Sequence, residues 1–292
     1  MSRWPTHLAI CLLLASGQTT ARDLPTGDGG SDGKPLWEWH GAVFGRYGSS
    51  YPASEEMQVN LVPLPIPIYR GRFLRLFEDG ENPIRGRIFE SDRIKLDLDL
   101  DLTFPSDSDS IAARVGMPDL DLLVQAGPEI DMQFVRQEFL KGRWHLALQS
   151  RAAVSFDGID PKYQGLNFSA EFRYITRPSD RDKFKFRITP TFATGRFMEY
   201  YYQVDPQFVT PERPAYGAKG GYLGTDFTWN WTRTMTKKLS VWVGARLSVH
   251  SGARNDQSPL FTREVTPSVY GAFMYRFWES KRRAVKPAHK AE

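Results

Sequence analysis

The feature that most constrains the fold is an unbroken alternation of apolar and polar residues over eleven positions. From Ile94 to Phe104 every even position is apolar and every odd position is charged or polar. A period of two is that of a β-strand, whose successive side chains point to opposite faces. Strands of soluble proteins are usually about five or six residues long, whereas a tilted strand needs about nine to eleven to cross a bilayer. The pattern therefore indicates a membrane-spanning strand.

The same alternation recurs along the chain and predicts a closed barrel. Polar residues on one face need water, so they line a lumen while the apolar face meets lipid. Bacterial single-chain barrels have an even strand count, which leaves both termini on the periplasmic side. We predict an all-β fold, a transmembrane antiparallel β-barrel of about twelve strands. The candidate strands are Trp37 to Tyr47, Gln58 to Tyr69, Arg72 to Phe77, Ile94 to Phe104, Leu122 to Phe134, Trp144 to Phe156, Leu166 to Tyr174, Phe184 to Phe192, Phe197 to Val204, Leu223 to Trp231, Leu239 to Val249 and Val269 to Phe277.

The start of the chain predicts export. Residues 1–21 carry Arg3, an apolar run, and the small residues Thr19 and Ala21 at the −3 and −1 positions of a cleavage site, as in a secretory signal peptide. Cys11, the one cysteine, lies in this segment. A mature chain without cysteine argues against a thiolate metal site or a cysteine-based enzyme.

Composition divides the remainder into three parts. Residues 22–35 are rich in Gly and Asp and predict a disordered periplasmic leader, residues 36–278 form the barrel, and residues 279–292 form a basic periplasmic tail. Residues 22–278 hold 32 basic and 32 acidic residues, so the chain's excess positive charge lies in the tail. A nucleic-acid-binding protein would need a basic stripe through its folded body, which argues against that class. The tail either helps to recruit a partner at the cell wall or is only a solvated end.

Aromatic residues and loop lengths give two further expectations. Aromatic residues near strand ends fit the girdles at the membrane interfaces: Trp229, Trp231, Tyr275, Trp278 and the run Tyr200 to Tyr202. The long links 205–220 and 251–266 fall outside the cell, and 193–196 forms a short periplasmic turn. Outer-membrane barrels have short periplasmic turns and longer extracellular loops. Residues 105–119 do not fit this rule, because they are long yet fall on the periplasmic side when the strands are counted back from the C-terminal one.

Short motifs in a fixed order make the chain resemble the MltA-interacting protein (MipA)/OmpV family of outer-membrane proteins. They are Gly45 to Ser54, Pro63 to Pro67 with Tyr69, Gly116 to Asp121 with Val124 and Gly127, Tyr200 to Val204, and Asp256 to Leu260. In one departure from outer-membrane barrels, which commonly end on an aromatic residue, a basic tail follows Phe277 and Trp278. The resemblance implies a non-catalytic outer-membrane barrel, a scaffold that joins a murein-hydrolysing lytic transglycosylase to a murein synthase. A narrow channel or an adhesin is the alternative.

An enzyme, in particular a lipid hydrolase, is the third hypothesis. Ser248 and His250 share the polar face of one strand, as a nucleophile and its base would, but that face points away from lipid. Asp97, Asp99 and Asp101 form a column about 7 Å apart, too far for adjacent members to hold one cation. We expect these carboxylates to pair with inward-facing cations: Arg151, Arg173, Lys185, Arg187 and Arg246. We therefore predict no catalytic, cofactor-binding or metal-binding residues.

Overall fold

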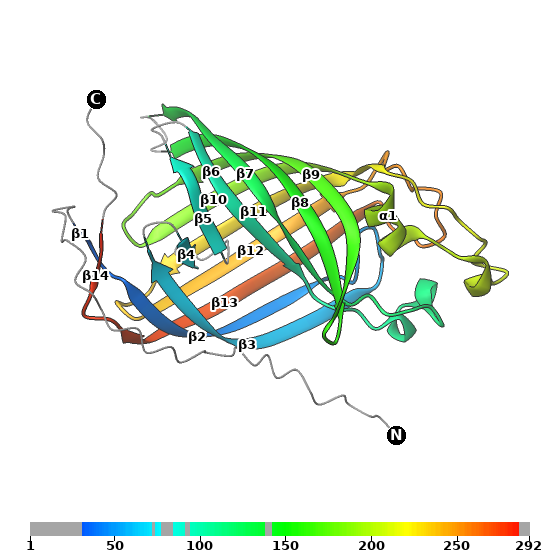
Figure 1. Ribbon diagram of the computed structural model, residues 1–292, viewed down its shortest axis with the longest axis horizontal. Coiled ribbons are helices and arrows are strands. Elements are labelled where there is room, and N and C mark those ends of the chain that lie inside the picture. Colours follow the sequence, from blue (N-terminus) through cyan, green and yellow to red (C-terminus); the bar gives the residue numbers. More distant parts are fainter. Residues whose placement is uncertain (1–30, 72–73, 77–83, 91–93, 138–141, 286–292) are drawn as a thin grey trace, which may run out of the picture.

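Twelve antiparallel strands close into a barrel in the computed structural model (Figure 1). The structure describes residues 31–71, 74–76, 84–90, 94–137 and 142–285. Consecutive strands pair around the barrel, and the last one pairs with the first to close it. The strands are β2 (Trp37–Ser49), β3 (Met57–Arg70), β4 (Leu74–Leu76), β5 (Ile84–Glu90), β6 (Ile94–Thr103), β7 (Leu122–Gln137), β8 (Gly142–Asp157), β9 (Asp160–Thr176), β10 (Asp182–Ala193), β11 (Gly221–Thr234), β12 (Leu239–Val249) and β13 (Val265–Glu279). The predicted fold class is confirmed.

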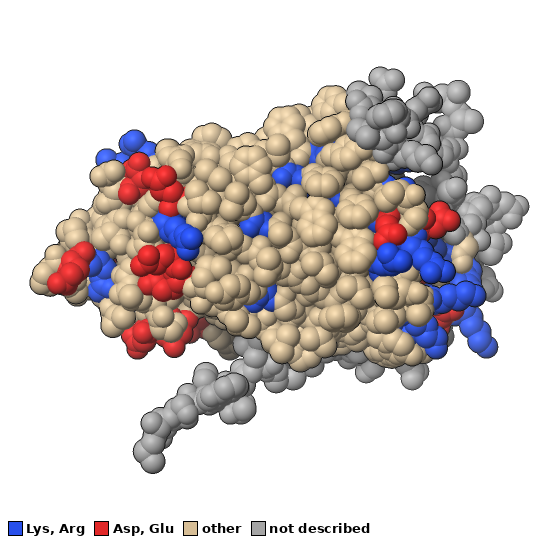
Figure 2. All heavy atoms as spheres, turned by 180° about the vertical axis from the view of Figure 1, so that it is seen from behind, with Lys and Arg blue, Asp and Glu red and all other residues tan. Residues whose placement is uncertain are grey.

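Side chains alternate between lipid and lumen as predicted. On β6, Leu98 and Leu102 are exposed on the outside, whereas Asp97 and Asp99 are buried inside. Large apolar side chains cover the exterior in the same way on the other long strands, which gives the belt of Figure 2, tan except for a few blue atoms and called the uncharged belt below. Such a belt is what a bilayer requires of a barrel exterior.

One predicted strand is wrong and one strand was not predicted, and the two differences offset each other. Phe197 to Val204 is not a strand, because α1 (Gly195–Tyr202) occupies it. A strand that the sequence reading missed, β5, restores the count to twelve. The corrected order moves residues 105–119 and 193–196 to the barrel end opposite the termini, so the apparent exception in loop lengths disappears.

We call the two ends of the barrel the terminus end and the loop end. The loop end carries α1 and three short 3-10 helices, η1 (Ser108–Ser110), η2 (Ala112–Arg114) and η3 (Pro206–Phe208) (Figure 1). No helix in the described part of the chain is long and apolar enough to cross a membrane.

At the terminus end, β1 (Ser31–Pro35) pairs with β14 (Arg283–Val285). The end of the leader and the start of the tail thus form a small two-stranded sheet, and the expectation of disorder does not hold for residues 31–35. The predicted signal peptide, residues 22–30 of the leader and residues 286–292 of the tail lie outside the described residues.

Candidate functional site

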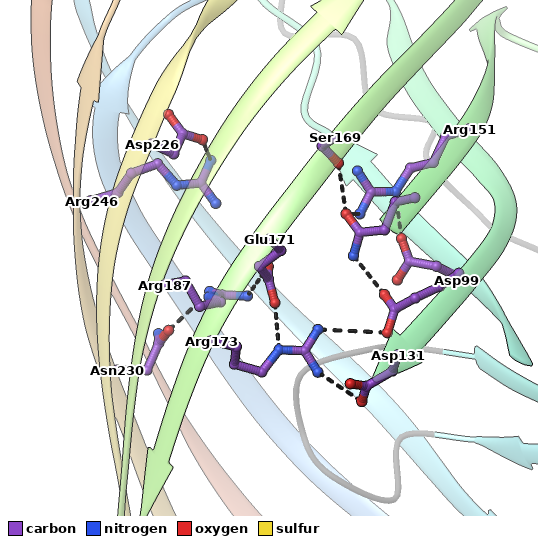
Figure 3. Close-up of polar contacts among 12 residues, drawn as sticks. Asp99, Asp131, Arg151, Ser169, Glu171, Arg173, Arg187, Asp226, Asn230 and Arg246 are labelled. Atoms are coloured by element: carbon purple, nitrogen blue, oxygen red, sulfur yellow. Dashed lines mark hydrogen bonds and ion pairs between the residues drawn. The ribbon is translucent and has the colours of Figure 1, made fainter. Parts of the chain in front are cut away.

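A network of charged side chains crosses the middle of the lumen (Figure 3). Arg173 of β9 lies at its centre, with nitrogen–oxygen distances of 3.6 Å to both Glu129 and Asp131, and it also donates from Nε to Glu171. Arg187 of β10 lies 3.7 Å from Glu171 and donates to Asn230 at 2.9 Å. Alternation on neighbouring strands points these side chains inward, where each charge meets an opposite one.

The network continues toward β6, where one member of the carboxylate column, Asp99, pairs with one of the expected cations, Arg151. Arg151 donates to Asp99 and, at 2.7 Å, to Gln149. Gln149 in turn accepts from Ser169 at 2.8 Å. Asp101, in contrast, is exposed to the lumen. Within the described ranges, no group of three or more His, Cys, Asp or Glu residues is arranged to hold a metal ion.

A second polar cluster occupies the lumen near the terminus end. Glu38 accepts from Arg70 at 3.0 Å and from Arg276 at 3.3 Å, and it lies 2.8 Å from His40 Nε2. Glu38 and Arg70 are both buried. These side chains fill the barrel interior between the central network and the terminus end.

Four loops form a cap over the loop end, and the cap has an apolar core of its own. The loops are residues 50–56, 104–121, 194–220 and 250–264. One face of α1 supplies Phe197, Met198, Tyr201 and Tyr202, all buried. This face packs with residues from the other three loops and from adjoining strands: Tyr51, Ala53, Ile111, Leu120 and Leu260, among others. Burial of apolar side chains far from the strand belt makes the cap a compact unit.

Hydrogen bonds between loops fix the cap in place. Tyr51 donates to the carbonyl of Leu260 at 2.6 Å, and Tyr202 donates to the carbonyl of Pro52 at 3.0 Å. Tyr201 contributes its own carbonyl, which accepts from Arg114 at 3.2 Å. Burial raises the pKa of Tyr51 to about 12 and raises the pKa of Tyr202 as well, so both hydroxyls stay protonated and can donate at neutral pH.

The run Tyr200 to Tyr202 therefore belongs to the cap and not to an interfacial girdle, which corrects that expectation. The other girdle residues lie on strands near the terminus end, where Tyr275 and Trp278 are exposed on the outside. The buried face of α1 repeats at spacings of three and four residues, as in Phe197, Met198, Tyr201 and Tyr202. The aromatic residues of such a helical face can be mistaken for those at the end of a strand.

His250, considered above together with Ser248, forms hydrogen bonds that hold the cap. The amide of Ala53 donates to His250 Nε2 at 3.2 Å, and His250 Nδ1 donates to the carbonyl of Leu223 at 2.9 Å. Both ring nitrogens are thereby engaged with backbone groups. A base that activates Ser248 would need one of them free and directed at its hydroxyl.

A chamber of about 410 Å³ remains between the cap and the central network. Its wall includes Tyr201 and His250 from the cap side and Ser248 from β12. Five guanidinium groups line it, those of Arg46, Arg151, Arg173, Arg187 and Arg246, together with the carboxylates of Asp99, Asp101, Glu171 and Asp226. Alternation alone could not locate this chamber, because the chamber depends on the cap.

Charge is segregated along the barrel axis, although the chain's body has no net charge. Among the residues whose exposure the structure describes, the exposed charged residues at the terminus end are nine basic and two acidic: Lys34, Arg143, Arg177, Arg181, Lys237, Lys238, Lys281, Arg282 and Arg283, with Asp180 and Glu279. At the loop end they are eleven acidic and five basic: Glu55, Asp107, Asp109, Asp119, Asp157, Asp160, Glu199, Asp205, Glu212, Asp256 and Glu264, with Lys162, Arg196, Lys219, Arg254 and Arg263. Figure 2 shows the two charged ends on either side of the uncharged belt. We call the basic set the basic rim.

Comparison with known proteins finds one matching family model and several similar solved structures. The family model for MltA-interacting protein MipA matches residues 41–277. No curated protein matches the sequence. Solved structures similar to the chain include NanC porin (8% identity, 80% of this chain and 98% of that chain, TM-score 0.37), OmpT of Vibrio cholerae (7%, 82% and 97%, 0.34) and an outer membrane channel from Pseudomonas putida F1 (10%, 87% and 100%, 0.35).

Proposed function

Because the chain belongs to the family of MltA-interacting protein MipA, an outer-membrane β-barrel family, we propose that it is a non-catalytic scaffold. In this proposal the barrel anchors a murein-hydrolysing lytic transglycosylase, and through it a murein synthase, at the inner face of the outer membrane. The family's name supports the first partner, and the sequence resemblance supports the second.

The observation that carries the proposal is the basic rim. In an outer-membrane barrel with an even strand count the terminus end faces the periplasm. The rim presents its cations on exposed turns, such as 177–181 and 235–238, and on the start of the tail. A partner with an acidic surface would be attracted at low salt, and its charges would be screened beyond roughly 8–10 Å at physiological ionic strength.

The start of the tail is part of the basic rim, so we extend the role proposed for the tail to the whole rim. Lys281, Arg282 and Arg283 contribute three of the nine exposed cations of the rim, and β14 fixes part of the tail against β1. We therefore propose that the tail acts together with the turns. Deleting residues 281–292 should weaken partner binding less than reversing the turn charges.

The test measures binding of a purified lytic transglycosylase to the barrel in lipid nanodiscs. The triple variant Arg181→Glu, Lys237→Glu, Lys238→Glu reverses three rim charges, and we expect affinity to fall at least about tenfold at low salt. The matched control Lys219→Glu, Arg254→Glu, Arg263→Glu makes the same charge change at the loop end and should leave affinity unchanged. Equal affinity for both variants, or loss with both, would refute the basic rim as the docking surface.

A narrow channel is the second candidate, and the chamber is the observation that favours it. The described residues nevertheless place the cap, the central network and the Glu38 cluster in series along the lumen. A scaffold whose lumen is filled in this way should give no current steps in a planar bilayer. Steady conductance of the purified barrel would favour the channel instead.

A further inference from the structure

We infer that the chamber beneath the cap is a binding site for a small organic anion with a flat ring, such as an aromatic carboxylate. The proposal concerns the lumen and does not depend on the scaffold function of the basic rim. It rests on the unequal pairing of the chamber's cations, on a row of aromatic rings and on two buried donors without acceptors.

The cations of the chamber are unequally paired: Arg151, Arg173 and Arg187 lie against carboxylates of its wall, whereas Arg46 and Arg246 are held less tightly. The wall also carries the exposed carboxylate of Asp101. Arg46 of β2 donates to the carbonyl of Ser49 at 2.9 Å, and it forms no ion pair with any other described residue. Arg246 of β12 lies 3.6 Å from Asp226, and both side chains are partly exposed to the lumen at 44% and 32% (Figure 3). A loose, solvated pair of this kind exchanges its partner readily, whereas the buried pairs of the central network do not.

The strand register brings these two cations to one part of the wall. Arg46 lies opposite Tyr270 on β13, and Tyr270 lies opposite Gly244 on β12. Arg246 is two residues beyond Gly244 on the same face. Each cation therefore approaches Tyr270 from a different neighbouring strand, and the two positive charges repel each other. A bound anion would relieve this repulsion.

Four aromatic rings form a row along the same wall. Phe44 stacks with Phe104 at a centroid distance of 5.8 Å and with Trp242 at 6.2 Å. Trp242 continues the row to Tyr270 at 5.0 Å. Gly244 makes room for Tyr270, because a Cβ there would lie 2.1 Å from the tyrosine ring. Aromatic faces of this kind favour a planar ligand in offset stacking.

Two buried donors of the chamber lack an acceptor among the described residues. They are the indole N–H of Trp242 and the Nε–H of Arg187. Burying a donor without a partner is unfavourable, so an acceptor on a bound ligand would stabilise both groups. Carboxylate oxygens accept strongly from guanidinium and indole N–H groups. The aromatic rings, the cations and the two unpaired donors of the chamber thus all suit the same class of ligand, an aromatic carboxylate.

The experiment compares nicotinate, nicotinamide and acetate by calorimetry with the purified full-length barrel in detergent. Nicotinate has both the ring and the charge, nicotinamide has the ring alone, and acetate has the charge alone. We expect nicotinate to bind at least about tenfold more tightly than either of the others. Equal binding of nicotinate and nicotinamide, or no heat from nicotinate up to millimolar concentration, would overturn the proposal.

Variants assign the binding to the chamber. Arg46→Gln and Arg246→Gln should each weaken nicotinate binding about tenfold and leave the weak nicotinamide binding unaltered. The conservative variant Arg246→Lys keeps the charge but loses the planar fork, so it should recover only part of the affinity. Lys237→Gln removes one positive charge at the basic rim and should bind nicotinate as the unmodified protein does. Nicotinate binding that survives both arginine variants, with folding verified by circular dichroism, would exclude this site.

Discussion

At the scale of single residues, Arg173 shows how charged side chains can be buried inside the barrel. Its side chain is almost completely buried, and three carboxylates from two strands, β7 and β9, surround it. Moving charges out of water is costly, and the attraction between them compensates only when every partner is present. The cluster is therefore far more sensitive to loss of one member than a pair in contact with water.

We predict that Arg173→Gln destabilises the folded barrel by about 3–5 kcal/mol, because it leaves Glu129, Asp131 and Glu171 with less positive charge in a buried site. Arg246→Gln is the control, since its pair with Asp226 is open to the lumen and should contribute about 0–1 kcal/mol. Urea unfolding of the two variants in lipid vesicles measures the difference. Similar losses would show that the central network is not specially buried.

The cap should loosen at alkaline pH. The pKa of Tyr51 is raised from about 10 in the unfolded chain to about 12 in the cap, so its stabilising effect is complete below pH 10 and is lost as pH rises toward 12. We expect protease cleavage of the loops to increase over this range before the strands unfold. In Tyr51→Phe, which cannot ionise, the transition should be weaker, with the remainder due to Tyr202 and its neighbours. Unchanged cleavage up to pH 12 would contradict this assignment.

At the scale of elements, the sequence predicted strands where one residue in two faces lipid and failed where that rule does not apply. Ile94 to Phe104 could be placed because lipid and lumen impose a strict alternation. Phe197 to Val204 was misplaced because α1 is buried in the cap, where tertiary packing and not lipid decides which residues are apolar. β5, at seven residues, was not predicted because it is too short for alternation to be decisive, whereas β4 lies within the predicted strand Arg72 to Phe77.

Two adjacent positions on β10 test this alternation. Ile188 is exposed on the outside near the middle of the strand, whereas Thr189 lines the chamber and lies opposite Asp226 on β11. We predict that Ile188→Arg costs about 2–4 kcal/mol, as for a cation in the bilayer midplane, and that Thr189→Arg costs little because Asp226 is beside it. Folding yield in vesicles, followed by the heat-dependent gel shift of barrels, separates the two. Equal yields would overturn the assignment of lipid and lumen faces.

At the scale of the whole molecule, the charge distribution depends on how the residues are arranged in space and not on composition alone. Equal numbers of acidic and basic residues in the body suggested a neutral surface, yet the two ends of the barrel have opposite charge (Figure 2). The lining of the lumen could be predicted from strand parity, as for Arg151 and Arg246. The cap and the chamber could not, because they depend on contacts between four loops that are distant in sequence.

Closure by the cap predicts that the chamber is shielded from solvent at the loop end. The chain's one cysteine lies in the predicted signal peptide, so Ser248→Cys would place a single thiol in the chamber of the mature protein. We expect a charged, membrane-impermeant thiol reagent to modify this cysteine slowly. Adding Met198→Lys, which puts a charge into the apolar core of the cap, should accelerate modification at least about tenfold. The adjacent change Glu199→Lys lies on the exposed face of α1 and should leave the rate unaltered. Rapid modification of Ser248→Cys without any change in the cap would mean that the loops do not close the lumen.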